Sequence, residues 1–113
     1  MSECVFCRIV SGDVPAQVVH RRDGFVAFHD IAPKAPVHLI AIPERHVTSL
    51  DDVEGLSPEE RADMLLFLAE TARVAEIVES GYRVTTNHGP DSRQSVFHLH
   101  WHVLGGGLLS ATM

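Results

Sequence analysis

Near its end the sequence carries the stretch Val96-Phe97-His98-Leu99-His100-Trp101-His102-Val103-Leu104, in which apolar side chains and imidazoles alternate from Phe97 to Val103. Successive side chains of a β-strand point to opposite faces of its sheet, so the alternation predicts a strand over residues 96–104. One face of this strand carries three imidazoles. The other face is wholly apolar, and we expect it to pack under a helix with Phe97, Leu99, Trp101 and Val103.

Three histidines on one face have no packing rationale, because a histidine in a protein core is usually solitary. Same-face neighbours of a strand lie about 6.6 Å apart and the outer two about 13 Å, whereas a Zn–N bond is about 2.0–2.1 Å. One metal ion therefore cannot easily bind all three rings. Neutral imidazole is a good nucleophile near neutral pH, and burial among other imidazoles disfavours its protonation. The spacing favours separate roles, with one ring attacking and another carrying a proton, and this chemistry needs no metal.

Outside this stretch the sequence predicts further strands and two helices. Asp23-Gly24 is typical of a tight hairpin between two β-prone runs. Apolar residues within residues 4–10 have the spacing of a short helix. The predicted strands before the last one are 17–20, 25–30, 37–42 and 82–87.

A long helix is predicted between the third and fourth of these strands. Ser57-Pro58 offers an N-cap and a proline at the first helical position, and Glu60 completes a capping box. Apolar residues recur at helical spacing from Met64 to Val78, and Gly81 provides the stop. Strands, one long helix and more strands predict an α+β fold with a largely antiparallel sheet, in one domain spanning residues 1–113.

The composition limits the partners that the protein can have. The chain has 113 residues, enough for one hydrophobic core, and a formal net charge of −6. A nucleic acid rewards clustered Lys and Arg, so this balance argues against a nucleic-acid partner but permits a mononucleotide. The first residues lack the regions of a signal peptide, and no apolar run approaches the roughly 20 residues of a membrane span. We therefore expect a cytoplasmic protein without a membrane partner.

The histidine stretch resembles the His-φ-His-φ-His-φ-φ signature of the histidine triad (HIT) family, where φ is apolar, and in particular its nucleoside phosphoramidase branch. Further stretches match in order within residues 4–107: Cys4-Val5-Phe6-Cys7 with Ile9, Phe28-His29-Asp30-Ile31 with Pro33, His38-Leu39-Ile40-Ala41-Ile42-Pro43 with His46, and Gln94-Ser95-Val96. The resemblance implies a five-stranded antiparallel sheet with one long and one short helix. It also implies a homodimer whose two sheets join into one sheet of ten strands.

The resemblance further implies a hydrolase or transferase that cleaves P–N or P–O bonds at the α-phosphate of a purine nucleotide conjugate. The middle histidine of the family's triad attacks the phosphorus, so His100 is the expected nucleophile and forms a covalent nucleotidyl-histidine. His102 and His38 would handle protons and phosphate contacts, and Ser95 would bind phosphate oxygens. The expected catalytic residues are His38, Ser95, His98, His100 and His102.

A second set of residues matches the family's nucleotide-binding positions. Asp30 corresponds to the acid that binds the ribose hydroxyls, which suits a carboxylate because it accepts two hydroxyl donors at once. The alternative role of Asp30 is that of a loop aspartate capping its own backbone. Asn87 corresponds to a phosphate-side asparagine, and apolar residues enclose the base. The expected nucleotide-binding residues are Phe6, Ile9, Phe28, Asp30, Ile31, Asn87 and Gln94.

The two cysteines, Cys4 and Cys7, are by themselves compatible with a redox pair, half of a zinc site or chance. A branch of the HIT family closes a structural zinc site with the histidine after the third strand and the first triad histidine. Those positions hold His46 and His98. The resemblance therefore implies zinc bound by Cys4, Cys7, His46 and His98, and two thiols without a metal are the alternative.

Two features depart from the phosphoramidase pattern. Arg93 stands where that branch usually has glycine, and it either binds phosphate or is ordinary loop surface. The chain ends at residues 110–113 without the tryptophan-containing tail that many of those enzymes use for substrate preference. The leaving group and the base preference therefore stay open. The alternative functions are a dinucleoside polyphosphate hydrolase of the same family and a zinc-stabilised nucleotide-binding partner protein with little turnover.

Overall fold

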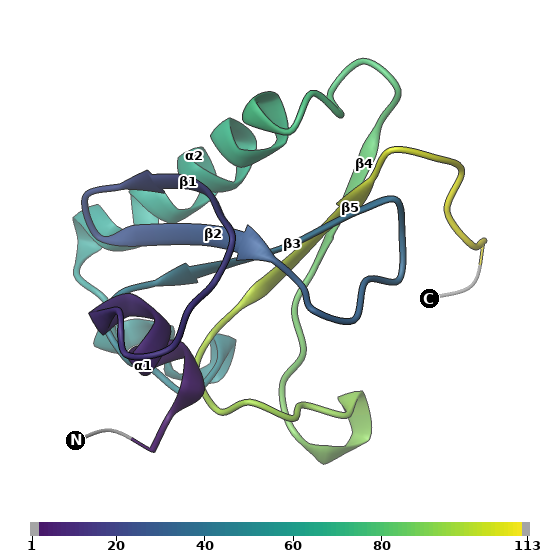
Figure 1. Cartoon of the computed structure of the whole chain (residues 1–113). Coiled ribbons are helices and arrows are strands. Elements are labelled where there is room, and N and C mark those ends of the chain that lie inside the picture. Colours follow the sequence, from purple (N-terminus) through teal and green to yellow (C-terminus); the bar gives the residue numbers. More distant parts are fainter. Residues whose placement is uncertain (1–2, 112–113) are drawn as a thin grey trace.

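An antiparallel sheet forms the centre of the computed structural model, which describes residues 3–111 (Figure 1). Its five strands lie in the order β1-β2-β3-β5-β4, so the last strand is inserted between β3 and β4. The strands are β1 (Val18–Arg22), β2 (Phe25–His29), β3 (Val37–Pro43), β4 (Tyr82–Thr85) and β5 (Trp101–Gly105). The helices of this part of the chain are α1 (Val5–Ser11), η1 (Leu50–Gly55), α2 (Pro58–Val74) and η2 (Pro90–Ser92). The predicted α+β fold with a five-stranded antiparallel sheet is therefore confirmed.

The alternation of side chains along β2 and β3 divides the core into two layers. The layer on the α2 side contains Phe25, Ala27, Leu39 and Ala41 together with Met64, Phe67 and Leu68 of the helix. The layer on the α1 side contains Phe6, Val26, Phe28, Ile40 and Ile42. Because helices cover both faces of these two strands, both strands are continuously apolar in sequence (Figure 1).

The predicted hairpin joins β1 to β2. Arg22 pairs with Phe25 across the turn, and Gly24 has a positive φ of 90°, which glycine adopts without steric cost. At the other end of β2, the backbone N–H of Asp30 donates to the carbonyl of His38 on β3 (3.0 Å). This register places an acidic side chain and an imidazole together at one end of the sheet.

The long helix begins as predicted but ends earlier. The Ser57 hydroxyl accepts the N–H of Glu60 (3.1 Å), and the Glu60 carboxylate accepts the N–H of Ser57 (2.7 Å), so the capping box is present. The helix stops at Val74, because the chain becomes left-handed two residues later (φ 59°). The prediction that the apolar face extends to Val78 is therefore wrong, since Val78 is half exposed and Ile77 fills the core instead.

The predicted strand over 96–104 is too long, because β5 begins only at Trp101. Residues 96–100 leave the ladder, and the backbone N–H of Leu99 donates to the carbonyl of Val47 (2.7 Å), which lies outside the sheet. The three histidines therefore do not lie on one regular strand face.

The apolar face of this stretch is also incomplete. Leu99 and Val103 are buried, and Trp101 donates its indole N–H to the sulfur of Met64 on α2 (3.3 Å). Phe97 was expected to pack under the helix, but 61% of its surface is exposed. Among the described residues, no helix has the length and apolar character needed to cross a membrane.

Candidate functional site

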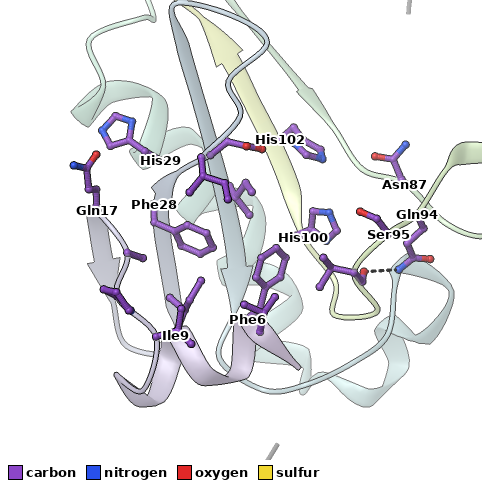
Figure 2. A pocket seen from close by; sticks show the side chains of 18 of the residues that line it. Phe6, Ile9, Gln17, Phe28, His29, Asn87, Gln94, Ser95, His100 and His102 are labelled. Carbon is purple, nitrogen blue, oxygen red and sulfur yellow. Dashed lines mark hydrogen bonds between the residues drawn. The ribbon is translucent and has the colours of Figure 1, made fainter. Parts of the chain in front are cut away.

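A cavity of about 930 Å³ lies between α1, the end of β2 and the segment that leads into β5. Figure 2 shows aromatic and aliphatic side chains of α1 and β2 on one side and polar side chains of residues 87–95 on the other. Every residue predicted to bind the nucleotide lines this cavity: Phe6, Ile9, Phe28, Asp30, Ile31, Asn87 and Gln94. Of the expected catalytic residues, the cavity is lined by Ser95, His100 and His102, but not by His38 or His98.

The apolar side of the cavity is buried at its base and exposed at its rim. Phe6 is buried and packs edge to face against Phe28, with ring centroids 5.6 Å apart. Ile31 lies beyond the end of β2 and is fully exposed. Two aromatic rings in fixed orientation and an uncovered aliphatic side chain suit the flat faces of a planar apolar group.

His100 is buried, and its surroundings fix the orientation of its ring. Its Nδ1 lies 2.8 Å from the carbonyl oxygen of His98. A carbonyl can only accept, so Nδ1 carries the proton of the neutral ring and Nε2 carries the lone pair. Phe6 and His102 both pack edge to face against the ring, with centroids 5.1 and 5.2 Å away. Neutral His100 therefore offers Nε2 as its basic nitrogen.

A chain of hydrogen bonds assigns the protons of the next two imidazoles. The backbone N–H of Lys34 donates to Nδ1 of His38 (2.9 Å), so neutral His38 carries its proton on Nε2. That nitrogen lies 2.9 Å from Nδ1 of His102 and donates to it. His102 in turn carries its own proton on Nε2. The chain thus leaves the N–H of His102 available at the cavity wall.

Both of these imidazoles are neutral at neutral pH. Burial lowers the pKa of His38 below its ordinary value, although the charge of Asp30 opposes this. Burial, with the neighbouring His100 and His38, lowers the pKa of His102 to about 4. The expected effect of burial among imidazoles is therefore present at both rings.

Asp30 borders the cavity and also holds its own loop. Its Oδ1 accepts the backbone N–H of Ala32 (2.7 Å), which is the local cap considered above as its alternative role. Its Oδ2 lies 3.4 Å from Nε2 of His38. An ionised carboxylate has about four acceptor sites, so the cap leaves capacity for further donors.

The polar side of the cavity is stabilised by its own side chains. Asn87 donates from Nδ2 to the carbonyl of Ser92 (2.7 Å), which fixes the plane of its amide. The amide of Gln94 accepts the N–H of Gly89 (3.0 Å) and donates to the carbonyl of Thr48 (2.8 Å). It also donates to the carbonyl of Val96 (3.2 Å; Figure 2). Gln94 therefore lines the cavity while its amide serves mainly to hold this segment in place.

The ring of His98 points away from the cavity into a second cluster. Its Nε2 lies 2.8 Å from the carbonyl oxygen of Pro43, so this nitrogen carries the proton and Nδ1 carries the lone pair. Burial lowers the pKa of His98, which keeps the ring neutral. Its Nδ1 lies 3.5 Å from the sulfur atoms of both Cys4 and Cys7, and 3.2 Å from Nδ1 of His46.

The geometry of this second cluster fits a tetrahedral metal ion. Zinc bonds of about 2.3 Å to sulfur and about 2.0–2.1 Å to nitrogen place the corners of a tetrahedron about 3.3–3.8 Å apart. The distances above agree with this, as does the 3.3 Å between the sulfur of Cys7 and Nδ1 of His46. All four ligand atoms lie within 4.8 Å of one another. The hydrogen bond from His98 to Pro43 is also the kind of outer contact that orients metal-binding imidazoles.

Asp30, His38 and His102 also bring three ligand atoms together, but their protons argue against a metal there. The backbone N–H of Lys34 donates to Nδ1 of His38, so Nε2 of that ring carries the proton. This N–H occupies the position that a metal ion shared by the three residues would need. This group is therefore a hydrogen-bond relay.

The sequence did not indicate which nitrogen of each imidazole carries the proton, because the groups that decide this belong to the backbone. The N–H of Lys34 and the carbonyls of Pro43 and His98 select the tautomers, and no side-chain pattern signals them. Gln17 and His29 also line the cavity beside β1 and β2 and were not assigned a role (Figure 2).

Comparisons with known proteins show which family has this fold. The HIT domain family matches residues 11–107, so the chain belongs to this family. An uncharacterised HIT-like protein of Chlamydia trachomatis is 41% identical over 113 residues, covering 95% of this chain and 96% of the relative.

Solved structures of the family show the same architecture. A HIT family hydrolase from Clostridium thermocellum is 33% identical with a TM-score of 0.86, covering 100% of this chain and 98% of its own. A histidine triad nucleotide-binding protein from Candida albicans is 25% identical with a TM-score of 0.80, covering 98% of this chain and 86% of its own.

Proposed function

We propose that the protein is a nucleotide hydrolase or transferase that attacks the α-phosphorus of a purine nucleotide conjugate with Nε2 of His100. The observation that carries this proposal is the state of that ring. It is buried on the wall of the cavity, and its Nδ1–H is held by the His98 carbonyl, so Nε2 is the nucleophilic nitrogen. The names of two relatives, a hydrolase and a nucleotide-binding protein, agree with this activity.

The cavity offers one region for each part of a nucleotide. Phe6, Ile9, Phe28 and Ile31 enclose the base, and Asp30 accepts the ribose hydroxyls. Asn87 and Ser95 bind phosphate oxygens on the polar side, next to His100. A volume near 930 Å³ falls within the range of about 300–1,000 Å³ that small-molecule sites occupy.

The reaction proceeds in two displacements. The lone pair on Nε2 of His100 forms a bond to the α-phosphorus, and the P–N or P–O bond to the leaving group breaks with its electron pair going to that group. Water then attacks the phosphorus, and the bond to His100 breaks and restores the lone pair. Over both steps, water supplies the hydroxyl on phosphorus and the proton on the leaving group. The Nε2–H of His102 hydrogen-bonds the leaving atom as its negative charge develops.

We further propose that Cys4, Cys7, His46 and His98 bind a structural zinc ion. The tetrahedral spacing of their ligand atoms supports this. When bound, the ion contributes folding free energy and ties α1 to the segment before β5. Nδ1 of His98 would be a ligand of this ion, and the carbonyl oxygen of His98 accepts the N–H of His100, so a bound ion would steady the nucleophile without entering the reaction.

Trapping of the covalent intermediate tests the proposed activity. Wild-type protein is mixed with adenosine 5′-phosphoramidate labelled at the phosphorus and quenched in alkali within one turnover. We expect label on the protein, no label on the His100→Asn variant, and AMP binding by both. His20→Gln, a histidine change outside the cavity, serves as the control and should label like wild type. Label on His100→Asn, or more than a few per cent of the wild-type kcat, would assign the nucleophile to another residue.

A further inference from the structure

Arg93 differs from the other residues of the cavity wall in its permanent positive charge. It is the single arginine or lysine among the cavity-lining residues of the described chain, whereas Asp30 contributes a negative charge there. Its guanidinium has no hydrogen-bond or ion-pair partner within residues 3–111. A cavity that takes an anionic ligand on a protein of net charge −6 thus has one permanent cation, and this cation has no internal role.

The backbone of Arg93 supplies an independent observation. Arg93 closes η2 in the left-handed conformation (φ 64°, ψ 36°), and its N–H donates to the carbonyl of Pro90 (3.0 Å). A side chain with a Cβ is disfavoured in this region by steric contact, whereas glycine is not. A strained conformation that persists at a site is a reason to look for a role of the side chain. The turn alone would be better served by glycine.

The position of Arg93 indicates which part of a ligand it meets. It directly precedes Gln94 and Ser95, which Figure 2 shows beside His100, on the side opposite Phe28 and Ile9. A nucleotide bound with its base on the apolar side has its α-phosphate at His100. Groups attached beyond that phosphorus then lie on the side of Arg93.

We propose that Arg93 is a specificity residue that binds a second phosphate beyond the α-phosphate, so the preferred substrates carry a phosphate chain in the leaving group. This inference rests on the proposed function and names its substrate class. An arginine guanidinium binds phosphate oxygens through two parallel N–H···O hydrogen bonds, a geometry that a lysine ammonium does not reproduce. The partnerless guanidinium and the strained backbone are both explained by this contact.

Binding measurements separate this role from a general effect of charge. Dissociation constants are measured for AMP and for the α,β-methylene analogue of ADP, which resists cleavage. We expect Arg93→Gly and Arg93→Asn to weaken the analogue about tenfold more than AMP, and Arg93→Lys to give a smaller loss. Arg61→Gln removes the same charge from an exposed position on α2 outside the cavity and should leave the ratio of the two constants unchanged. The selective loss should shrink as ionic strength rises.

Thermal unfolding supplies the second readout, because a loss of affinity through misfolding would lower the Tm. Arg93→Gly should raise the Tm by roughly 2–5 °C, since the strain is released. Equal weakening of AMP and the analogue, or the same selective loss in Arg61→Gln, would overturn the proposal. A lower Tm in both Arg93→Gly and Arg93→Asn would also overturn it. AMP binding by wild type reports on the proposed function separately, since that function fails if AMP does not bind at all.

Discussion

Asp30 combines two roles in one carboxylate, and a mutation can separate them. Oδ1 holds the N–H of Ala32, and Oδ2 stands beside His38 at the cavity wall. We expect Asp30→Ala to weaken ribonucleotide binding by about 1–3 kcal/mol, the effect of losing hydrogen bonds to a charged group. The measurement is the affinity for AMP and for its 2′,3′-dideoxy analogue, in wild type and mutant.

The dideoxy analogue distinguishes the ribose contact from a change in the loop. Wild type should bind the analogue more weakly than AMP, whereas Asp30→Ala should bind both alike. Asp30→Asn retains an acceptor for the N–H of Ala32 and so serves as a control for loop structure. If removing the hydroxyls weakens wild type and mutant equally, Asp30 does not contact the ribose.

At the scale of single residues, the sequence could predict which side chains gather at the site. It could not predict which nitrogen of each imidazole carries the proton. The alternation of histidines predicted separate roles for the three rings. The His98 ring does lie in a different cluster from the rings of His100 and His102. The reason is local. The backbone N–H of Leu99 donates to the carbonyl of Val47 outside the sheet, and the His98 ring before it points toward the cysteines. The tautomers depend on backbone groups that any residue carries, so no sequence pattern could indicate them.

At the scale of elements, the cysteine cluster joins three segments that are distant in sequence. Cys4 caps α1, where its sulfur accepts the N–H of Cys7 (3.4 Å), so the first turn of the helix places both sulfurs together. His46 follows β3, and His98 precedes β5. A metal bound there would stabilise the contact of α1 with the sheet, and through Phe6 of α1 it would also support the cavity wall.

Metal removal tests this arrangement. Purified untagged protein should contain about one zinc per chain, and Cys4→Ser and Cys7→Ser should contain almost none. Each variant should lose at least about 5 °C in Tm, because structural zinc contributes folding free energy. A chelator should lower the Tm of wild type and leave that of the variants unchanged. Wild-type protein with far less than one equivalent of zinc, or a Tm insensitive to both treatments, would leave the cluster as a group of thiols and imidazoles.

The ends of elements were the least predictable feature at this scale. Capping residues fixed the start of α2 in the sequence, because a capping box is a local pattern. Its end was not predictable, since Val78 continues the helical spacing while a left-handed residue at Glu76 has already stopped the helix. Ile77 is buried where Val78 was expected, because of tertiary packing that the periodicity of the sequence does not reveal.

At the scale of the whole molecule, the two edges of the sheet differ. β1 forms one edge, and it contains a bulge between Val18 and His20 and an exposed arginine, Arg21. Bulges and charges are the features that prevent an edge strand from pairing with another chain. β4 forms the other edge, pairs with β5 in regular register, and exposes Tyr82. The expected homodimer with a ten-stranded sheet would therefore form through β4.

A pair of matched mutations tests this interface. Tyr82→Lys places a charge on the β4 edge, where a two-fold axis would bring it near its copy, and Val18→Lys places the same charge on the β1 edge. We expect wild type to be a dimer by light scattering, and Tyr82→Lys to raise the dimer dissociation constant about tenfold, equivalent to about 1.4 kcal/mol. Val18→Lys should leave it unchanged, because 46% of the Val18 surface is exposed on the edge that the bulge protects. A wild-type monomer at all concentrations would contradict the dimer, whereas a larger effect of Val18→Lys would move the interface to β1.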